Sequence, residues 1–357
     1  MTTLKNLLLP FFLLLSFIVV FAGSIVWQFV QNPKIPIPQG LAPSSTPAPT
    51  KAAADFSNHA KMSLQKLSLT TNDSGFGGAS ISEDQKSLYL ANPWENSIYL
   101  LNVQSGKVAD KIAIAYPLAP IPYNQNLLVV QKNSLTVLSP DHEIVKSVPL
   151  DFEPLASLIT SDLKYLLLTD GQNNTLSIYS TKTLELISQI PLTASPLNLF
   201  ENNGLVFISF SNDSRLAILS LSSLKIVSTL NLQFNPQKLV FIKNSTKFLA
   251  TDASGLSLWI FDSVKDKTPK RIALNDESFD LCQIPQTDFY LILGRHGSVF
   301  VFDAKKEMVV KTFTIQSSLL SEDTWSKILF VSSPTPKVFL LSTDGKKLQT
   351  YSLTSSN

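Results

Sequence analysis

One strand-like segment recurs seven times in this chain of 357 residues, and this repeat constrains the possible fold more than any other feature of the sequence. Consecutive copies begin 37, 41, 40, 42, 41 and 39 residues apart. A steady period near 40 residues indicates a single supersecondary unit that is copied along the chain. The copies, each marked by its first residue, are SIYLLN (Ser97), SLTVLS (Ser134), TLSIYS (Thr175), RLAILS (Arg215), SLWIFD (Ser257), SVFVFD (Ser298) and KVFLLS (Lys337).

Each copy lies between two further predicted strands of different character. The strand before it is an almost continuous apolar run, such as SLYLAN from Ser87, which is typical of a strand covered on both faces. The strand after it, such as VADKIAI from Val108, alternates and carries more charge, as an outer, half-exposed strand does. In the seventh unit we assign these two roles to ILFVSS from Ile328 and KLQTYSL from Lys347.

A short innermost strand is predicted between the units, often announced by a proline, which a strand tolerates at its first residue: Pro120, Pro154, Pro196 and Pro236. Four short antiparallel strands per repeat of about 40 residues indicate a β-propeller blade. The predicted fold class is therefore all-β, a seven-bladed β-propeller of four-stranded blades. The segment Leu64–Leu69 is a further outer strand that adds to the edge of blade seven, replaces it, or packs as a cover.

The unit from Ser87 to Pro120 resembles the YVTN-type repeat of lactonase-like and surface-layer-like propellers. It has a strand that ends in Asn92, a polar turn, a second strand, the tripeptide Ser-Gly-Lys at 105–107, an outer strand and a closing proline. Two other units, 164–196 and 289–315, fit more loosely, and no unit contains the literal motif. The resemblance covers residues 75–353 and implies a propeller with seven blades.

The first sixty residues differ in composition from the repeats. A short tail, 1–6, precedes 24 uncharged residues, 7–30, which are long enough to cross a bilayer as one helix. We predict an uncleaved signal-anchor here; cleavage after Ala22 and a buried core helix are the alternatives. Residues 31–60 form a linker rich in Pro, Ala, Ser and Thr, and residues 61–357 form the propeller.

The charges beside the predicted span indicate its orientation. Lys5 and the amino terminus precede it, and this short positive tail favours a cytoplasmic N-terminus. The propeller is then extracytoplasmic, in the periplasm or at the cell surface, and residues 31–60 are a stalk that holds it away from the membrane.

The net charge of the propeller gives no support for nucleic-acid binding. The chain has 29 Lys and Arg and 27 Asp and Glu, of which three and one precede Phe56, so that 26 of each sign remain. A nucleic-acid-binding domain normally carries a basic face and a high pI. We therefore predict no nucleic-acid partner.

Motifs that carry chemistry are scarce in the sequence. One cysteine excludes a disulfide framework, and three scattered histidines argue against a multi-histidine metal centre. Haem attachment, sialidase and quinoprotein patterns, a nucleophile elbow and a phosphate loop do not occur. We predict no catalytic residue, no metal site and no cofactor.

Candidate binding residues gather in loops that share one face of a propeller, namely the loops that enter each innermost strand and the hairpins between second and third strands. Exposed aromatic rings beside a few charges are typical of protein-recognition surfaces. The candidates are Trp94, Tyr116, Phe152, Glu153, Phe234, Asp276, Glu277, Phe279, Arg295 and His296. Oxygen atoms of Asp276, Glu277 and Asp280 also form a possible cation site.

The leading functional prediction is a membrane-anchored, extracytoplasmic propeller that binds a protein or an envelope component through this face. The first alternative is a lactonase-like hydrolase, which requires convergent charged groups along the central channel. The second alternative is a cytoplasm-facing scaffold tethered to the membrane.

Overall fold

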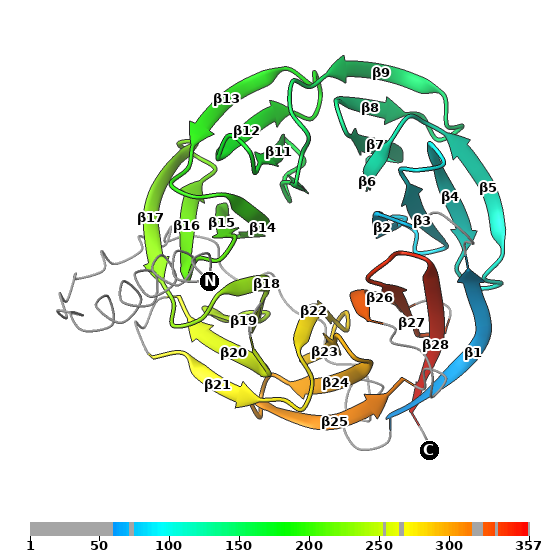
Figure 1. Cartoon of the computed structure of the whole chain (residues 1–357), viewed down its shortest axis with the longest axis vertical. Coiled ribbons are helices and arrows are strands. Elements are labelled where there is room, and N and C mark those ends of the chain that lie inside the picture. The colour runs from blue at the N-terminus through cyan, green and yellow to red at the C-terminus, as the bar shows by residue number, and fades with distance from the viewer. Residues whose placement is uncertain are drawn as a thin grey trace, which may run out of the picture. The chain divides into compact units, whose positions relative to one another are not determined.

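The computed structural model describes residues 60–70, 75–252, 255–263, 268–315, 324–332 and 335–355, with the backbone alone for 60–70 and 354–355. These residues form 28 strands in seven four-stranded antiparallel sheets that surround one axis (Figure 1), which confirms the predicted seven-bladed propeller. The predicted anchor, 7–30, and the linker up to residue 59 lie outside the described residues. Within the described ranges, no helix has the length and hydropathy needed to span a membrane.

Blades 1 to 6 each use four consecutive strands, in chain order from the axis outward. Blade 1 contains β2 (Gly78–Ile81), β3 (Ser87–Asn92), β4 (Ser97–Asn102) and β5 (Val108–Ala113). Blade 2 contains β6 (Pro117–Tyr123), β7 (Asn126–Gln131), β8 (Ser134–Leu138) and β9 (Ile144–Pro149). Blade 3 contains β10 (Ala156–Ile159), β11 (Tyr165–Asp170), β12 (Thr175–Ser180) and β13 (Leu186–Pro191).

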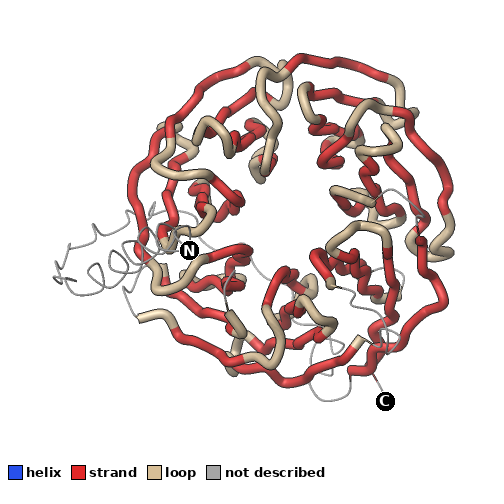
Figure 2. The backbone as a smooth tube through the Cα atoms, viewed as in Figure 1, coloured by secondary structure: helices blue, strands red, loops and turns tan. Residues whose placement is uncertain are grey.

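Blades 4 to 6 repeat this arrangement, and Figure 2 shows the short loops that join the strands. Blade 4 contains β14 (Pro196–Asn202), β15 (Leu205–Phe210), β16 (Arg215–Ser220) and β17 (Lys225–Asn231). Blade 5 contains β18 (Pro236–Phe241), β19 (Lys247–Asp252), β20 (Ser257–Asp262) and β21 (Lys270–Ala273). Blade 6 contains β22 (Ser278–Gln283), β23 (Phe289–Gly294), β24 (Ser298–Asp303) and β25 (Met308–Thr314).

Blade 7 departs from the predicted strand roles. Its order from the axis outward is β26 (Trp325–Val331), β27 (Lys337–Ser342), β28 (Lys347–Ser355) and β1 (Ala60–Thr70). The segment from Ile328 is therefore in the innermost strand, the segment from Lys337 is the second strand, and the segment from Lys347 is the third. The prediction shifted each of them outward by one strand, because the apolar run ILFVSS resembles a second strand.

The outer strand of blade 7 comes from the other end of the chain. β1 runs antiparallel to β28, from Ala60 opposite Ser355 to Thr70 opposite Lys347, with one register shift (Figure 1). Of the three uses left open for Leu64–Leu69, the structure selects addition to the edge of blade seven, where β1 pairs with β28 and is the fourth strand. The ring is thereby closed by hydrogen bonds between segments from both ends of the propeller, as sheet closure requires.

The hydrophobic core consists of seven apolar clusters, one between each pair of neighbouring blades. Second strands supply residues to both sides: in β3, Leu88 and Leu90 face blade 7, whereas Ala91 faces blade 2. Because successive side chains of a strand point to opposite faces, both faces must be apolar. This explains the nearly continuous apolar runs in the sequence.

The outer strands have the mixed pattern that the sequence predicted. In β9, Ile144 and Val145 are 66% and 64% exposed, and only one residue of that strand is even partly buried. Because each outer strand is the free edge of its sheet, its side chains meet solvent on one or both faces.

Candidate functional site

The predicted binding residues all belong to loops or strand ends on one face of the propeller, called the loop face below, but they do not form a single site. Three of them lie where blades 1, 2 and 3 meet, and five belong to blade 6. Two are packed into the protein. The first set is Trp94, Tyr116 and Glu153; the second is Asp276, Glu277, Phe279, Arg295 and His296; the packed pair is Phe152 and Phe234.

The blade 1–3 group is a row of aromatic and charged side chains. The Trp94 side chain is 71% exposed, and its ring meets the Tyr116 ring edge to face with 6.0 Å between centroids. The Lys132 ammonium lies 5.1 Å from the Tyr116 ring centroid and 3.5 Å from a carboxylate oxygen of Glu153. Sequence reasoning missed Lys132, because it occupies a two-residue hairpin with no other signal.

The backbone around Tyr116 explains its position in this row. Its φ of 41° lies in the left-handed region, which turns the chain sharply between β5 and β6. The Asn96 side chain accepts a hydrogen bond from the Tyr116 amide at 2.9 Å, and the Tyr116 carbonyl accepts one from the Lys132 amide. These bonds join the loops of blades 1 and 2, so the half-buried Tyr116 ring beside Trp94 is held by a fixed backbone.

The blade 6 group centres on Arg295. Its guanidinium lies 4.9 Å from the centroid of the Phe279 ring, and its Nε lies 3.5 Å from a Glu277 carboxylate oxygen. Arg295 and Glu277 are also joined by a backbone hydrogen bond of 2.8 Å. The loop that enters β22 and the hairpin between β23 and β24 are therefore joined by three kinds of contact.

Asp276 is the buried anchor of the same two loops. Its carboxylate accepts hydrogen bonds from the His296 ring at 2.9 Å and from the amides of His296 and Ser298. Burial favours the neutral acid, but the bonds from His296 and Ser298 outweigh it and lower the pKa of Asp276 below its ordinary value. The His296 side chain remains 62% exposed beside this anchor.

Phe234 and Phe152 are used for packing. Phe234 is 5% exposed and stacks on the Trp259 ring with 4.6 Å between centroids and an interplanar angle of 4°. Phe152 is half-buried against the apolar cluster between blades 2 and 3. Neither ring is therefore a large exposed surface, and the loop face is less aromatic than the sequence suggested.

The three acidic residues of the possible cation site diverge. Asp276 is bonded to His296, Glu277 pairs with Arg295, and Asp280 accepts a hydrogen bond from the Ile328 amide of blade 7 at 2.9 Å. Among the residues that the structure describes, no cluster of three or more His, Cys, Asp or Glu side chains could hold a metal ion.

Four charged residues also lie on the innermost strands, and sequence reasoning named only Asp280 among them, as part of the possible cation site. They are Glu201 near the end of β14, Lys238 on β18, Asp280 on β22 and Lys327 on β26. The signal that could have found them is a charge within an otherwise apolar strand. Cys282 shares β22, where burial raises the pKa of its thiol above the ordinary value and favours the protonated form.

Comparison with known proteins supports the fold and goes no further. No family model and no curated protein matches the chain. Among solved structures, the chain is similar to KlHsv2 with loop 6CD replaced by a Gly-Ser linker, with a TM-score of 0.60 and 13% sequence identity. The match covers 80% of this chain and 98% of that one. At this identity the similarity concerns the propeller fold alone.

Proposed function

We propose that this protein is a membrane-anchored, extracytoplasmic propeller that binds a protein or an envelope component through the blade 1–3 part of its loop face. The residues that would carry the contact are Trp94, Tyr116, Lys132 and Glu153. A seven-bladed propeller is consistent with a binding or scaffold module. The apolar segment 7–30 supports the anchor, and the proline-rich residues 31–59 support a stalk.

The observation that carries this proposal is the exposed Trp94 ring beside Tyr116. Tryptophan and tyrosine are enriched among the residues that dominate binding energy at protein interfaces. The neighbouring Lys132 and Glu153 are about half exposed and form an ion pair at 3.5 Å, which suits the polar rim of an interface. A single exposed ring is ordinary, but an aromatic pair with a charged border matches the anatomy of a recognition site.

A cross-linking experiment in the cells that make the protein tests the proposal. A photoreactive phenylalanine analogue replaces Trp94 in the full chain, and a matched protein carries the analogue at Ile144, which is 66% exposed on the outer strand of blade 2. We expect one protein or envelope polymer to be cross-linked from position 94 and not from position 144. Equal labelling from both positions, or none from position 94, would contradict the proposal.

The energetic contribution of the site is tested on the partner so identified. Trp94→Ala should weaken its binding by at least about tenfold, because loss of a central aromatic contact typically costs more than 1 kcal/mol. Lys132→Glu should also weaken it, by placing a like charge beside Glu153. Ile144→Ala is the control and should leave the dissociation constant unchanged.

The location is tested separately from the binding. A reporter fused after Asn357 should be degraded when protease is added to intact cells, if the N-terminus is cytoplasmic and the propeller is outside. Protection of the reporter would favour the cytoplasm-facing scaffold. Release of the reporter from the membrane fraction would favour cleavage after Ala22 over an uncleaved anchor.

A lactonase-like hydrolase is the second candidate, because Lys238, Asp280 and Lys327 place charged groups on the innermost strands. The test is hydrolysis of simple lactones by the full chain and by its Asp280→Asn variant. Activity that disappears in this variant, while the variant keeps its melting temperature, would favour the hydrolase.

A further inference from the structure

Equivalent positions on the innermost strands differ sharply in chemistry around the ring. The third residue of β14, β18, β22 and β26 is polar: Asn198, Lys238, Asp280 and Lys327. The third residue of β6 is Ala119. Each of these five strands has a register shift beside this position. Because such bulges redirect a side chain, the same local irregularity presents a different group in each blade.

Two of the four polar residues are engaged between blades. The Asn198 side chain donates a hydrogen bond to the Gln237 carbonyl of blade 5 at 2.7 Å. The Asp280 carboxylate accepts one from the Ile328 amide of blade 7 at 2.9 Å. Both are therefore explained as inter-blade contacts, and neither requires a ligand.

The two lysines are different. Within the part of the chain that the structure describes, the Lys327 ammonium has neither a hydrogen bond nor an ion pair, and the Lys238 ammonium has only the Phe200 ring at 5.6 Å. Desolvation lowers the pKa of Lys327, and Lys238 adds to this effect while Asp280 opposes it. When both amines are protonated, the two ammonium groups and the Asp280 carboxylate sum to +1, and an anion beside Lys327 would favour its charged form.

Lys327 lines a cavity of about 440 Å³ whose other walls come from blades 1, 2 and 3. A cavity of this size is in the range of small-molecule sites. Apart from Lys327 its strand residues are largely apolar or small, and include Ala79, Ala119, Ile121, Leu158 and Ile159. The site thus has a cationic end and an apolar wall.

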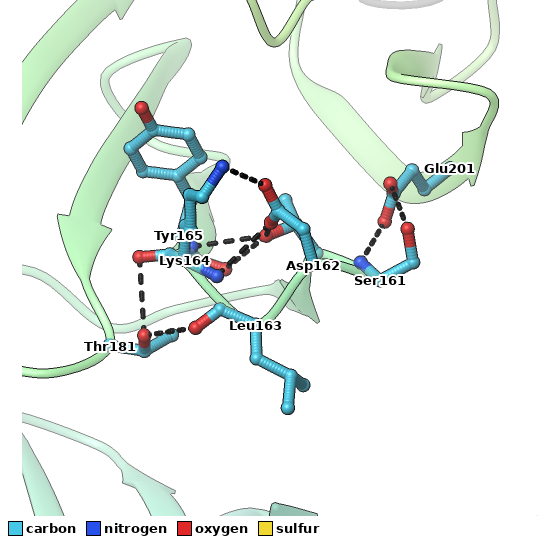
Figure 3. Close-up of polar contacts among 8 residues, drawn as sticks. Ser161, Asp162, Leu163, Lys164, Tyr165, Thr181 and Glu201 are labelled. Carbon is cyan, nitrogen blue, oxygen red and sulfur yellow. Dashed lines mark hydrogen bonds and ion pairs between the residues drawn. The ribbon is translucent and has the colours of Figure 1, made fainter.

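The hairpin between β10 and β11 completes that wall and is held in place by its own polar contacts (Figure 3). The Ser161 amide and hydroxyl donate hydrogen bonds to the Glu201 carboxylate of blade 4, at 2.6 and 2.7 Å. Asp162 forms an ion pair with Lys164 at 3.1 Å. The Leu163 side chain extends away from these contacts and also lines the cavity. The apolar wall is therefore preorganised.

We propose that this central cavity binds a small organic anion, with its acidic group at Lys327 and its apolar body against blades 1 to 3. A monocarboxylate with a short alkyl chain has the required chemistry, because burial of the chain offsets the cost of ordering the ligand and the carboxylate pairs with the unpartnered ammonium. The inference does not depend on the loop-face function, since the cavity and the Trp94 group use different residues.

Calorimetric titration of the full chain with octanoate tests this proposal. Octanol has the same apolar body without the charge, and acetate has the charge without the body. We expect saturable octanoate binding that is at least about tenfold tighter than that of either control compound. No saturable octanoate binding, or equal binding of octanol, would overturn the proposal.

Variants of the cationic end separate binding from folding. Lys327→Met keeps the length of the side chain and should weaken octanoate binding at least about tenfold, whereas Lys327→Arg should stay within about threefold of the parent. Lys238→Met should weaken binding less, because it does not line the cavity wall. Lys305→Met, at a side chain that is 78% exposed, is the control. Unchanged binding by a Lys327→Met protein with the parental melting temperature would overturn the assignment.

Discussion

The Lys337 ammonium of blade 7 donates a hydrogen bond to the Val103 carbonyl of blade 1 at 2.9 Å, across the junction where the propeller closes. It donates a second bond to the Gln104 carbonyl at 2.8 Å. Lys337 is only 3% exposed, and desolvation lowers its pKa below the ordinary lysine value. A buried cation bonded to two backbone carbonyls therefore joins the last blade to the first.

Lys337→Met should destabilise the propeller by about 1–2 kcal/mol, because the buried Val103 carbonyl and the partly buried Gln104 carbonyl lose their donor. The gain from removing a desolvated charge offsets only part of this loss. Equilibrium unfolding in urea measures the difference, and Lys86→Met, at a side chain that is 78% exposed, is the matched control. A Lys337→Met protein as stable as the parent would show that the junction does not depend on this contact.

Removal of β1 should destabilise blade 7 in a way that a peptide can reverse. A chain that begins at Gly75 lacks the strand opposite β28, and so exposes an unpaired edge. We expect a lower melting temperature and self-association of this protein. A synthetic peptide with the sequence of residues 60–70 should restore the melting temperature, whereas a scrambled peptide should not. If the shortened chain melts like the full one, the closure by β1 contributes little to stability.

The number and type of blades could be predicted from the sequence because burial on both faces leaves a periodic apolar pattern. The roles of strands in blade 7 could not, because the run from Ile328 is apolar enough for either an innermost or a second strand. The pairing decides their roles: β26, β27 and β28 are consecutive from the axis outward, and β1 pairs with β28 as the fourth strand. Pairing between the ends of a chain has no local signature in either segment.

The sequence indicated the face of the propeller on which the candidate residues lie, but not which of them contact one another. Loop topology placed Trp94 and Arg295 on the same face, and they lie in blades 1 and 6. Which side chains contact each other within each group depends on side-chain packing, which the repeat does not specify.

The exposure of Phe234 could not be predicted either. An aromatic residue in a loop is buried only if another side chain covers it, and here the Trp259 ring stacks on Phe234. Lys327 could not be placed at the central channel from the sequence, because the segment from Ile328 was predicted to be a second strand. In the structure it belongs to β26, an innermost strand.

Gly294→Ala should destabilise blade 6 by about 1–3 kcal/mol, the usual range for overpacking. A Cβ at this position would lie 2.8 Å from the Asp276 Cβ and closer still to its carboxylate. Asp276 cannot move away without losing its bonds to His296 and Ser298. Gly171→Ala is the comparison, because its added Cβ meets only the ends of the Leu155 and Ser195 side chains, at 3.1 and 3.2 Å. Equal stability of the two variants in urea would contradict this account.

Asp276→Asn should reveal an acid-dependent contribution to stability. The pKa of Asp276 is lowered in the folded protein despite burial, because the bonds from His296 and Ser298 favour the carboxylate. The unfolded chain therefore binds a proton more readily, so the stabilisation is complete at neutral pH and is lost as the pH falls through the folded-state pKa. We expect the parent to exceed the variant by about 2 kcal/mol near pH 6, as for hydrogen bonds to charged groups. Urea unfolding at several pH values should show the difference narrowing in acid, and a difference that is constant or grows below pH 4 would contradict the assigned role of the carboxylate.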